Sequence, residues 1–141
     1  MKTLLTGASG LVGSTINADL VISNRGQVEA VIHTAARVGG LGANMNHMAE
    51  FYHDNILINT NVLEAARRTG VTKVVSFLST CIFPDSAEYP LTEDQLHKGE
   101  PHDSNFGYSY AKRMLEVHSR AIANQYDLNY TCVIPTNIYG P

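Results

Sequence analysis

Residues 3–13 read Thr3-Leu4-Leu5-Thr6-Gly7-Ala8-Ser9-Gly10-Leu11-Val12-Gly13. A short apolar run that leads into a Gly-x-x-Gly-x-x-Gly spacing predicts a buried strand, a tight turn and the start of a helix. Glycine permits the turn, and the backbone N–H groups at a helix N-terminus favour a negatively charged ligand. The stretch therefore indicates a dinucleotide-binding α/β fold, and the alternative interpretation is a glycine turn without a ligand.

The rest of the chain continues this alternation of strands and helices. Apolar runs at 19–23, 30–34, 73–79 and 130–134 predict further strands. Helical periodicity predicts helices over 48–69, with Gly70 as the stop signal, and over 108–126. The strands are continuously apolar, which is typical of a parallel sheet that is covered on both faces. We therefore expect a Rossmann-like, doubly wound parallel sheet.

Two segments lack a periodic pattern. Residues 37–45 are rich in Gly and Asn and predict a loop. Residues 84–106 contain prolines and many polar side chains and predict a long loop, which inside a compact domain is often functional.

Composition excludes several classes of function. The chain has 141 residues, enough for one domain with its own core, and a formal net charge of −3. That balance does not suit a nucleic-acid surface, and no apolar run reaches the roughly 18 residues of a membrane span. Cys81 and Cys132 are expected to be free thiols in a reducing cytoplasm. The six histidines show no metal-ligand spacing, so we expect no metal site.

Tyr108 and Lys112 lie four residues apart on the second long helix, one turn from each other on the same face. An ammonium beside a phenol favours the phenolate, so we expect the pKa of Tyr108 to fall from its usual value near 10. Tyr108 would then act as a general acid or base near neutral pH. Tyr110 lacks such a partner, because position 114 is Met. The alternative is a surface Tyr and a solvated Lys.

Ser79 and Cys81 follow the strand predicted at 73–79, at the end where open parallel sheets bind ligands. The Ser79 hydroxyl can bind a substrate oxygen, or it can merely cap its own backbone. A partly exposed Cys81 in electropositive surroundings can act as a base, whereas a buried cysteine is inert. His33 is expected to be packed in the core or at a cofactor's edge, and His97 and His102 to be solvated.

Four strings in the chain carry a resemblance to a known family. They are His33-Thr34-Ala35-Ala36-Arg37-Val38-Gly39-Gly40, Ser79-Thr80-Cys81-Ile82-Phe83-Pro84, Asn105-Phe106-Gly107-Tyr108-Ser109-Tyr110-Ala111-Lys112-Arg113 and Ile134-Pro135-Thr136-Asn137-Ile138-Tyr139-Gly140-Pro141. Together with Gly7–Gly13 they resemble the GDP-L-fucose synthase family of the extended short-chain dehydrogenase/reductase superfamily. The second and fourth strings are far more specific than the glycine turn or Tyr-x-x-x-Lys.

The resemblance implies an oxidoreductase and isomerase that uses NADP. Its reaction would be the 3,5-epimerisation and 4-reduction of GDP-4-keto-6-deoxy-D-mannose to GDP-L-fucose in nucleotide-sugar metabolism. In that family Tyr108 would donate a proton to the C4 oxygen and Lys112 would hold the nicotinamide ribose and lower the Tyr108 pKa. Ser79 would bind the C4 oxygen, and Cys81 would be the base of the epimerisation.

The same resemblance assigns the residues that border the cofactor. The pyrophosphate would lie on Gly7, Ala8, Ser9, Gly10, Leu11, Val12 and Gly13, with Arg25 near the 2′-phosphate. The adenosine would be bordered by Ala35 and Ala36, and the nicotinamide by Pro135, Thr136, Asn137 and Ile138. The family also implies a GDP-sugar substrate and a homodimer built from the helices predicted at 48–69 and 108–126.

The chain departs from the family at two places. Only twenty-three residues, 7–29, separate the first strand from the one at 30–34, too few for the helix, strand and helix of the family. The chain also stops at Pro141, whereas the family continues with a histidine acid and a smaller substrate domain. We therefore expect residues 1–141 to form an incomplete NADP-binding domain without a second domain, and to have low or no activity alone.

Two alternative functions remain open from the residues. One is another nucleotide-sugar epimerase or dehydratase of the superfamily, although Cys81 favours the fucose reaction because one-step C4 epimerases need no thiol base there. The other is a non-catalytic nucleotide-binding or interaction module.

Overall fold

A computed structural model describes residues 3–6 and 28–138 of the chain. Four strands form one parallel sheet in the order β1 (Thr3–Thr6), β2 (Ala30–His33), β3 (Lys73–Phe77) and β4 (Asn129–Val133). The strands pair in register, with Val31 opposite both Leu4 and Val74, and Val74 opposite Tyr130. These four strands confirm the predictions, whereas the strand expected at 19–23 lies outside the described residues.

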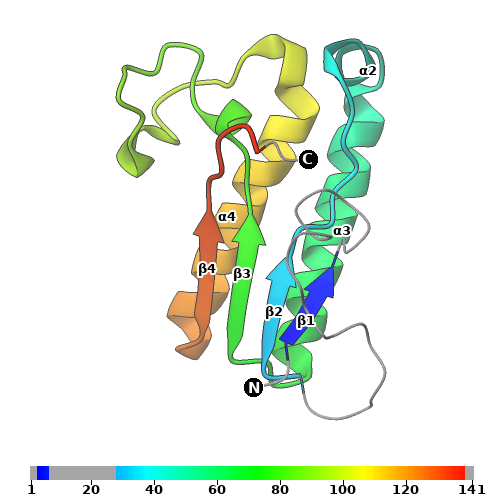
Figure 1. The fold of residues 1–141 in the computed structure, drawn as a ribbon, viewed down its shortest axis with the longest axis vertical. Coiled ribbons are helices and arrows are strands. Elements are labelled where there is room, and N and C mark those ends of the chain that lie inside the picture. The colour runs from blue at the N-terminus through cyan, green and yellow to red at the C-terminus, as the bar shows by residue number, and fades with distance from the viewer. Residues whose placement is uncertain (1–2, 7–27, 139–141) are drawn as a thin grey trace.

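Two long helices connect the strands. Helix α3 (Met48–Arg68) leads from β2 towards β3, and α4 (Phe106–Tyr126) leads towards β4. They lie side by side on one face of the sheet (Figure 1). This is the Rossmann-like α/β arrangement that the sequence predicts, with parallel strands joined by helical crossovers. The helix that the glycine turn is expected to open lies outside the described residues.

Helix α3 ends where Gly70 was expected to stop it. Gly70 has φ +78°, a left-handed conformation that favours glycine. The Val71 N–H donates to Ala66 O at 2.9 Å, and the Gly70 N–H donates to Arg67 O at 3.2 Å. These two bonds satisfy carbonyls that the helix end leaves free, and the buried side chains of Val71 and Ala66 join the core beside them.

The main core lies between the sheet and the two helices. Alternate strand residues bury their side chains there, because successive side chains of a strand point to opposite faces. The core comprises Val31, Leu63, Ala66, Val71, Val74, Leu78, Ile82, Leu115, Ile122 and Tyr130, among others. Burial of this kind contributes about 1.5–3 kcal/mol for each large aliphatic side chain.

The prediction of a loop over 37–45 is wrong in part. Helix α2 (Leu41–Asn46) forms there, despite glycines that disfavour helices. Asn44 is buried, and its side-chain amide donates to Gly39 O at 2.9 Å and Gly40 O at 3.2 Å. The side chain therefore satisfies backbone carbonyls at the helix start, an effect that composition does not reveal.

The prediction of a helix over 108–126 is confirmed by α4, but the buried face of this helix is not purely apolar. Met114 and Val117 are 37% and 36% exposed, while the buried face of the helix includes Ser109, Lys112 and Arg113. Apolar periodicity therefore locates the helix without revealing that polar side chains are buried on it.

Candidate active site

The carboxyl ends of β2, β3 and β4 meet at one edge of the sheet (Figure 1). Residues 34–37, 78–82 and 134–138 leave the sheet from that edge. This is the end at which open parallel sheets bind ligands. Ala35 and Ala36, half-buried, and Pro135, Thr136, Asn137 and Ile138, increasingly exposed, follow β2 and β4 here. The structure thus places these predicted cofactor residues near one edge, whereas Gly7–Gly13 and Arg25 lie outside the described residues.

Gly107 brings the start of α4 against the start of α3. A Cβ added at Gly107 would lie 2.2 Å from Met48 O, a backbone atom that cannot move without moving the helix. Only glycine permits this approach. Because Tyr108 directly follows Gly107, this contact also fixes the position of the Tyr108 backbone.

Lys112 reaches from α4 to the end of β3. Its Nζ donates to Phe77 O at 2.7 Å and lies 5.9 Å from the centre of the Tyr108 ring. Lys112 is 2% exposed, so its ammonium is almost completely removed from water. Tyr108 and Lys112 therefore lie close together, as their spacing predicts, beside the strand that leads to Ser79.

Burial controls the protonation of this pair. It raises the pKa of Tyr108 to about 12, and the charge of Cys81 acts in the same direction. Burial lowers the pKa of Lys112 to about 8, against the opposing effects of Cys81 and Cys132. The expectation that the pKa of Tyr108 falls below its usual value is therefore wrong for this structure, because desolvation of the phenolate dominates. Tyr108 is protonated at neutral pH and can donate a proton.

Ser79 and Cys81 lie together after β3. The Cys81 thiol donates to Ser79 Oγ at 3.3 Å, and both side chains are partly buried. Residues Thr80–Ile82 form a short 3-10 turn, which turns the chain back towards α4. Ser109 of α4 donates from Oγ to Cys81 O at 2.9 Å. The Ser79 hydroxyl and the Cys81 thiol therefore lie where the chain leaving β3 contacts α4, the helix that also carries Lys112 and, beside it, the Tyr108 ring.

His33 is buried, in agreement with one of its two expected positions, and it belongs to a hydrogen-bond network that the sequence did not reveal. Its Nε2 lies 3.0 Å from Asn59 Oδ1, and its Nδ1 lies 2.7 Å from Thr6 Oγ1. Because an amide oxygen only accepts, Nε2 carries the proton and Nδ1 accepts from Thr6. Asn59 Nδ2 donates onward to Ala111 O at 3.4 Å. Burial lowers the pKa of His33 to about 4, so the ring is neutral and links β1, β2, α3 and α4.

Asn55 holds the segment that follows β2. Its Oδ1 accepts from Arg37 N at 3.0 Å, and its Nδ2 donates to Arg37 O at 3.0 Å and Phe51 O at 2.7 Å. Asn55 and Asn59 are both buried on α3. Asn55 and Asn59 continue the i, i+4 spacing of Phe51 and Leu63, and this spacing was the signal in the sequence that they are buried. It was not recognised because polar residues are usually assigned to the exposed face of a helix.

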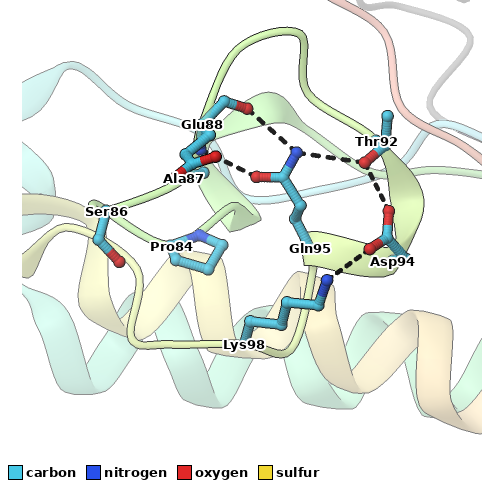
Figure 2. Close-up of a pocket in the computed structure, with 8 residues that line it drawn as sticks. All are labelled: Pro84, Ser86, Ala87, Glu88, Thr92, Asp94, Gln95 and Lys98. Carbon is cyan, nitrogen blue, oxygen red and sulfur yellow. Dashed lines mark hydrogen bonds and ion pairs between the residues drawn. The ribbon is translucent and has the colours of Figure 1, made fainter.

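The long loop contains a separate polar pocket, lined by residues of 84–98 (Figure 2). Gln95 organises it, because its Oε1 accepts from Glu88 N at 2.9 Å and its Nε2 donates to Glu88 O at 3.0 Å and Pro90 O at 3.1 Å. Asp94 pairs with Lys98 at 2.5 Å. The polar groups bind one another and close the loop on itself.

The two loop histidines are exposed, as expected, but both have partners. His97 Nε2 lies 3.0 Å from Glu116 Oε2, and His102 Nδ1 accepts from Ser104 N at 3.2 Å. Within residues 3–6 and 28–138, no group of three or more His, Cys, Asp or Glu side chains is arranged to hold a metal ion. Over the same residues, no helix combines the length and apolar character needed to span a membrane.

Comparison with known proteins adds independent findings. The model of the NAD dependent epimerase/dehydratase family matches residues 17–141. A probable GDP-L-fucose synthase of Drosophila melanogaster is 44% identical over 167 residues, covering 99% of this chain and 52% of the relative. The GDP-L-fucose synthase of Dictyostelium discoideum is 45% identical, with 98% and 52% covered. The chain thus spans about half the length of these curated relatives.

A solved structure agrees with these relatives. A GDP-L-fucose synthetase from Naegleria fowleri, bound to NADP, superposes with a TM-score of 0.85 at 38% identity, covering 99% of this chain and 51% of that one. The match of 167 positions to the Drosophila relative exceeds the 141 residues of this chain. The relative therefore has residues inside the match that this chain lacks, which agrees with the shortened spacing noted in the sequence.

Proposed function

The chain belongs to the NAD dependent epimerase/dehydratase family, and from that premise we propose that it carries the NADP-binding half of a GDP-4-keto-sugar epimerase and reductase. The proposed reaction is the NADPH-dependent 3,5-epimerisation and 4-reduction of GDP-4-keto-6-deoxy-D-mannose to GDP-L-fucose. Three contacts at the carboxyl edge of the sheet support the proposal. Cys81 hydrogen-bonds to Ser79, Ser109 hydrogen-bonds to Cys81 O, and Lys112, which lies beside the Tyr108 ring, hydrogen-bonds to Phe77 O.

The donor groups at this edge suit a nicotinamide nucleotide. An ammonium has three N–H donors, and Phe77 O accepts one from Lys112. The remaining donors can bind the two hydroxyls of a ribose. Ala35 and Ala36 would border the adenosine with small side chains, and Pro135, Thr136, Asn137 and Ile138 would border the nicotinamide. When bound, NADPH supplies the hydride that reduces the C4 ketone.

The chain's own residues have three tasks in the proposed reaction. The Ser79 hydroxyl binds the C4 oxygen and orients the ketone. Once deprotonated, Cys81 acts as the base that takes a proton from C3 or C5, which the neighbouring ketone makes acidic, and a water molecule returns a proton to the opposite face of that carbon. Tyr108 then gives its proton to the C4 oxygen during reduction. Its pKa of about 12 keeps that proton in place at neutral pH, and the nearby ammonium of Lys112 stabilises the phenolate that remains.

A single-turnover assay tests this proposal. The chain, in excess over GDP-4-keto-6-deoxy-D-mannose, is mixed with NADPH in D2O, and the sugar nucleotide is analysed by mass spectrometry. We expect slow formation of GDP-fucose with deuterium at C3 and C5. Tyr108→Phe should lower reduction by about 100-fold, whereas Cys81→Ser should abolish deuterium incorporation.

Matched controls are available in the chain. Tyr110→Phe removes the neighbouring phenol, and Cys132→Ser removes the other thiol, and both should leave the reaction unchanged. The proposal fails if the folded chain does not bind NADPH, or if Tyr108→Phe and Tyr110→Phe behave alike.

The proposed partner of the chain is a second copy of itself, in the cytoplasm. Ile56 and Thr60 of α3 and Met114, Val117 and Ala121 of α4 line a shallow apolar groove between the helices. Both cysteines are free, which suits a reducing compartment. Sedimentation of the wild-type chain should indicate a dimer that Val117→Glu dissociates, and a monomeric wild type would exclude it.

A further inference from the structure

Two side chains of α4 bind consecutive carbonyls of the turn that carries Cys81. Ser109 Oγ donates to Cys81 O at 2.9 Å, and Arg113 Nε donates to Ile82 O at 2.7 Å. Ser109 and Arg113 lie one helical turn apart, so they point from the same face of α4. The 3-10 turn Thr80–Ile82 is therefore held to the helix at two adjacent points.

Arg113 makes this contact at a cost to stability. It is only 4% exposed, and burial lowers the pKa of its guanidinium. In the described part of the chain its hydrogen bonds go to the backbone carbonyls Ile82 O and Gly99 O, each at 2.7 Å, and its Nη2 atom has no hydrogen-bond partner. The guanidinium also lies 5.4 Å from the centre of the Tyr110 ring. A buried cation without a bound carboxylate is unfavourable, and an apolar side chain of similar length would pack at lower cost.

The second carbonyl bound by Arg113 belongs to the far end of the long loop. Asp85 N donates to Glu100 O at 3.0 Å, so residues 84–85 and 99–101 run past each other where the loop begins and ends. By binding Ile82 O and Gly99 O together, Arg113 joins both the beginning and the end of the loop to α4. A planar guanidinium can reach both carbonyls at once, whereas a lysine ammonium lacks that fork.

The two bonded residues alternate with the proposed catalytic residues. Ser109 follows Tyr108, and Arg113 follows Lys112, while the carbonyls that they bind lie beside the Cys81 thiol. We propose that Ser109 and Arg113 are positioning residues that fix the Cys81 segment relative to Tyr108 and Lys112. Their catalytic meaning rests on the proposed function, but the geometry that they maintain can be measured without it.

The test uses the reactivity of the two thiols in the chain. Iodoacetamide is applied in limiting amounts, and peptide mass spectrometry gives the alkylation rates of Cys81 and Cys132. Loss of either positioning side chain should free the Thr80–Ile82 turn and raise the ratio of the Cys81 rate to the Cys132 rate. We expect an increase of about fivefold in Ser109→Ala and in Arg113→Met, the size expected from one lost hydrogen bond.

Further variants separate positioning from general loosening. Arg113→Lys keeps the charge but loses the fork, and should raise the ratio by about twofold. Arg68→Met removes an exposed guanidinium from α3 and should leave the ratio unchanged. If Arg113→Met does not fold, the nearly isosteric Ser109→Ala decides the question.

Two results would overturn the inference. One is an unchanged ratio in folded Ser109→Ala and Arg113→Met. The other is an equal acceleration of both thiols, which indicates loosening of the whole domain. Neither result depends on NADPH or sugar, so the inference and the proposed function can fail separately: a raised ratio in a chain that binds no NADPH would refute only the proposed function.

Discussion

Helices α3 and α4 have the same length, 21 residues, and pack against each other, yet they bury polar side chains of different kinds. Helix α3 buries the neutral amides of Asn55 and Asn59, whose nitrogen and oxygen atoms both have hydrogen-bond partners. Helix α4 buries the cations Lys112 and Arg113, whose hydrogen bonds in the described chain go to backbone carbonyls. Satisfied amides stabilise a fold, whereas unpaired buried cations reduce its stability. We infer from this contrast that the cations of α4 are buried for the candidate site and not for the stability of the fold.

The largest expected effect comes from the point where the two helices touch. Gly107→Ala places a methyl group 2.2 Å from Met48 O, so the helices must separate. We expect a loss of about 3 kcal/mol or more in the free energy of unfolding. Urea denaturation followed by circular dichroism measures it.

Gly42→Ala is the matched control, because nothing lies within 4 Å of the added methyl group. Equal stabilities of Gly107→Ala and Gly42→Ala would show that the close approach of the helices is not required.

The network on α3 predicts a dependence of stability on pH. The pKa of His33 is about 4 in the folded chain, below its ordinary value of about 6.5. Between these values the unfolded chain binds more protons, so stability is complete above pH 6.5 and falls as pH drops towards 4. The loss is about 3 kcal/mol.

Urea denaturation of the wild type and His33→Gln across this pH range isolates the contribution of the ring, since the other histidines are shared. Parallel pH profiles for the two proteins would contradict the buried neutral assignment of His33.

A smaller effect of opposite sign is expected on α4. Lys112→Met removes a buried cation but leaves Phe77 O without its donor, so we expect stability at pH 7 to rise by about 1 kcal/mol. The pKa of Lys112 is about 8 when folded, below its ordinary value of about 10.5. Between these values the unfolded wild type binds more protons, so its stability increases with pH relative to Lys112→Met. Thermal unfolding at pH 7 and pH 9.5 tests both statements, and a destabilised variant at pH 7 would contradict them.

The layout of the fold could be predicted because it depends on local patterns. The strands at 30–34 and 73–79, the helix at 48–69 and its stop at Gly70 follow from apolar periodicity and from the conformational freedom of glycine. Helix α2 could not be found in this way, because the composition of its segment is typical of a loop. The start of the helix depends on the side-chain amide of Asn44, which donates to the carbonyls Gly39 O and Gly40 O.

The proximity of Tyr108 and Lys112 was predictable, but the electrostatics of this pair were less so. Tyr108 and Lys112 are adjacent on a helix in any α/β arrangement, so their proximity follows from spacing alone. Whether the pKa of Tyr108 is raised or lowered depends on its burial by distant segments, which the spacing of residues does not reveal. The roles of Asn59 and Arg113 were missed for the same reason, because each binds a group more than twenty-five positions away.

Titration of NADPH fluorescence with the purified chain tests the central claim most directly, namely that the buried cation of α4 and the carboxyl edge of the sheet form a nicotinamide nucleotide site. We expect saturable binding by the wild type and by Arg68→Met, and at least tenfold weaker binding by Lys112→Met, about 1.4 kcal/mol or more. Absence of binding by the folded wild type, or equal affinity of the wild type and Lys112→Met, would contradict the account.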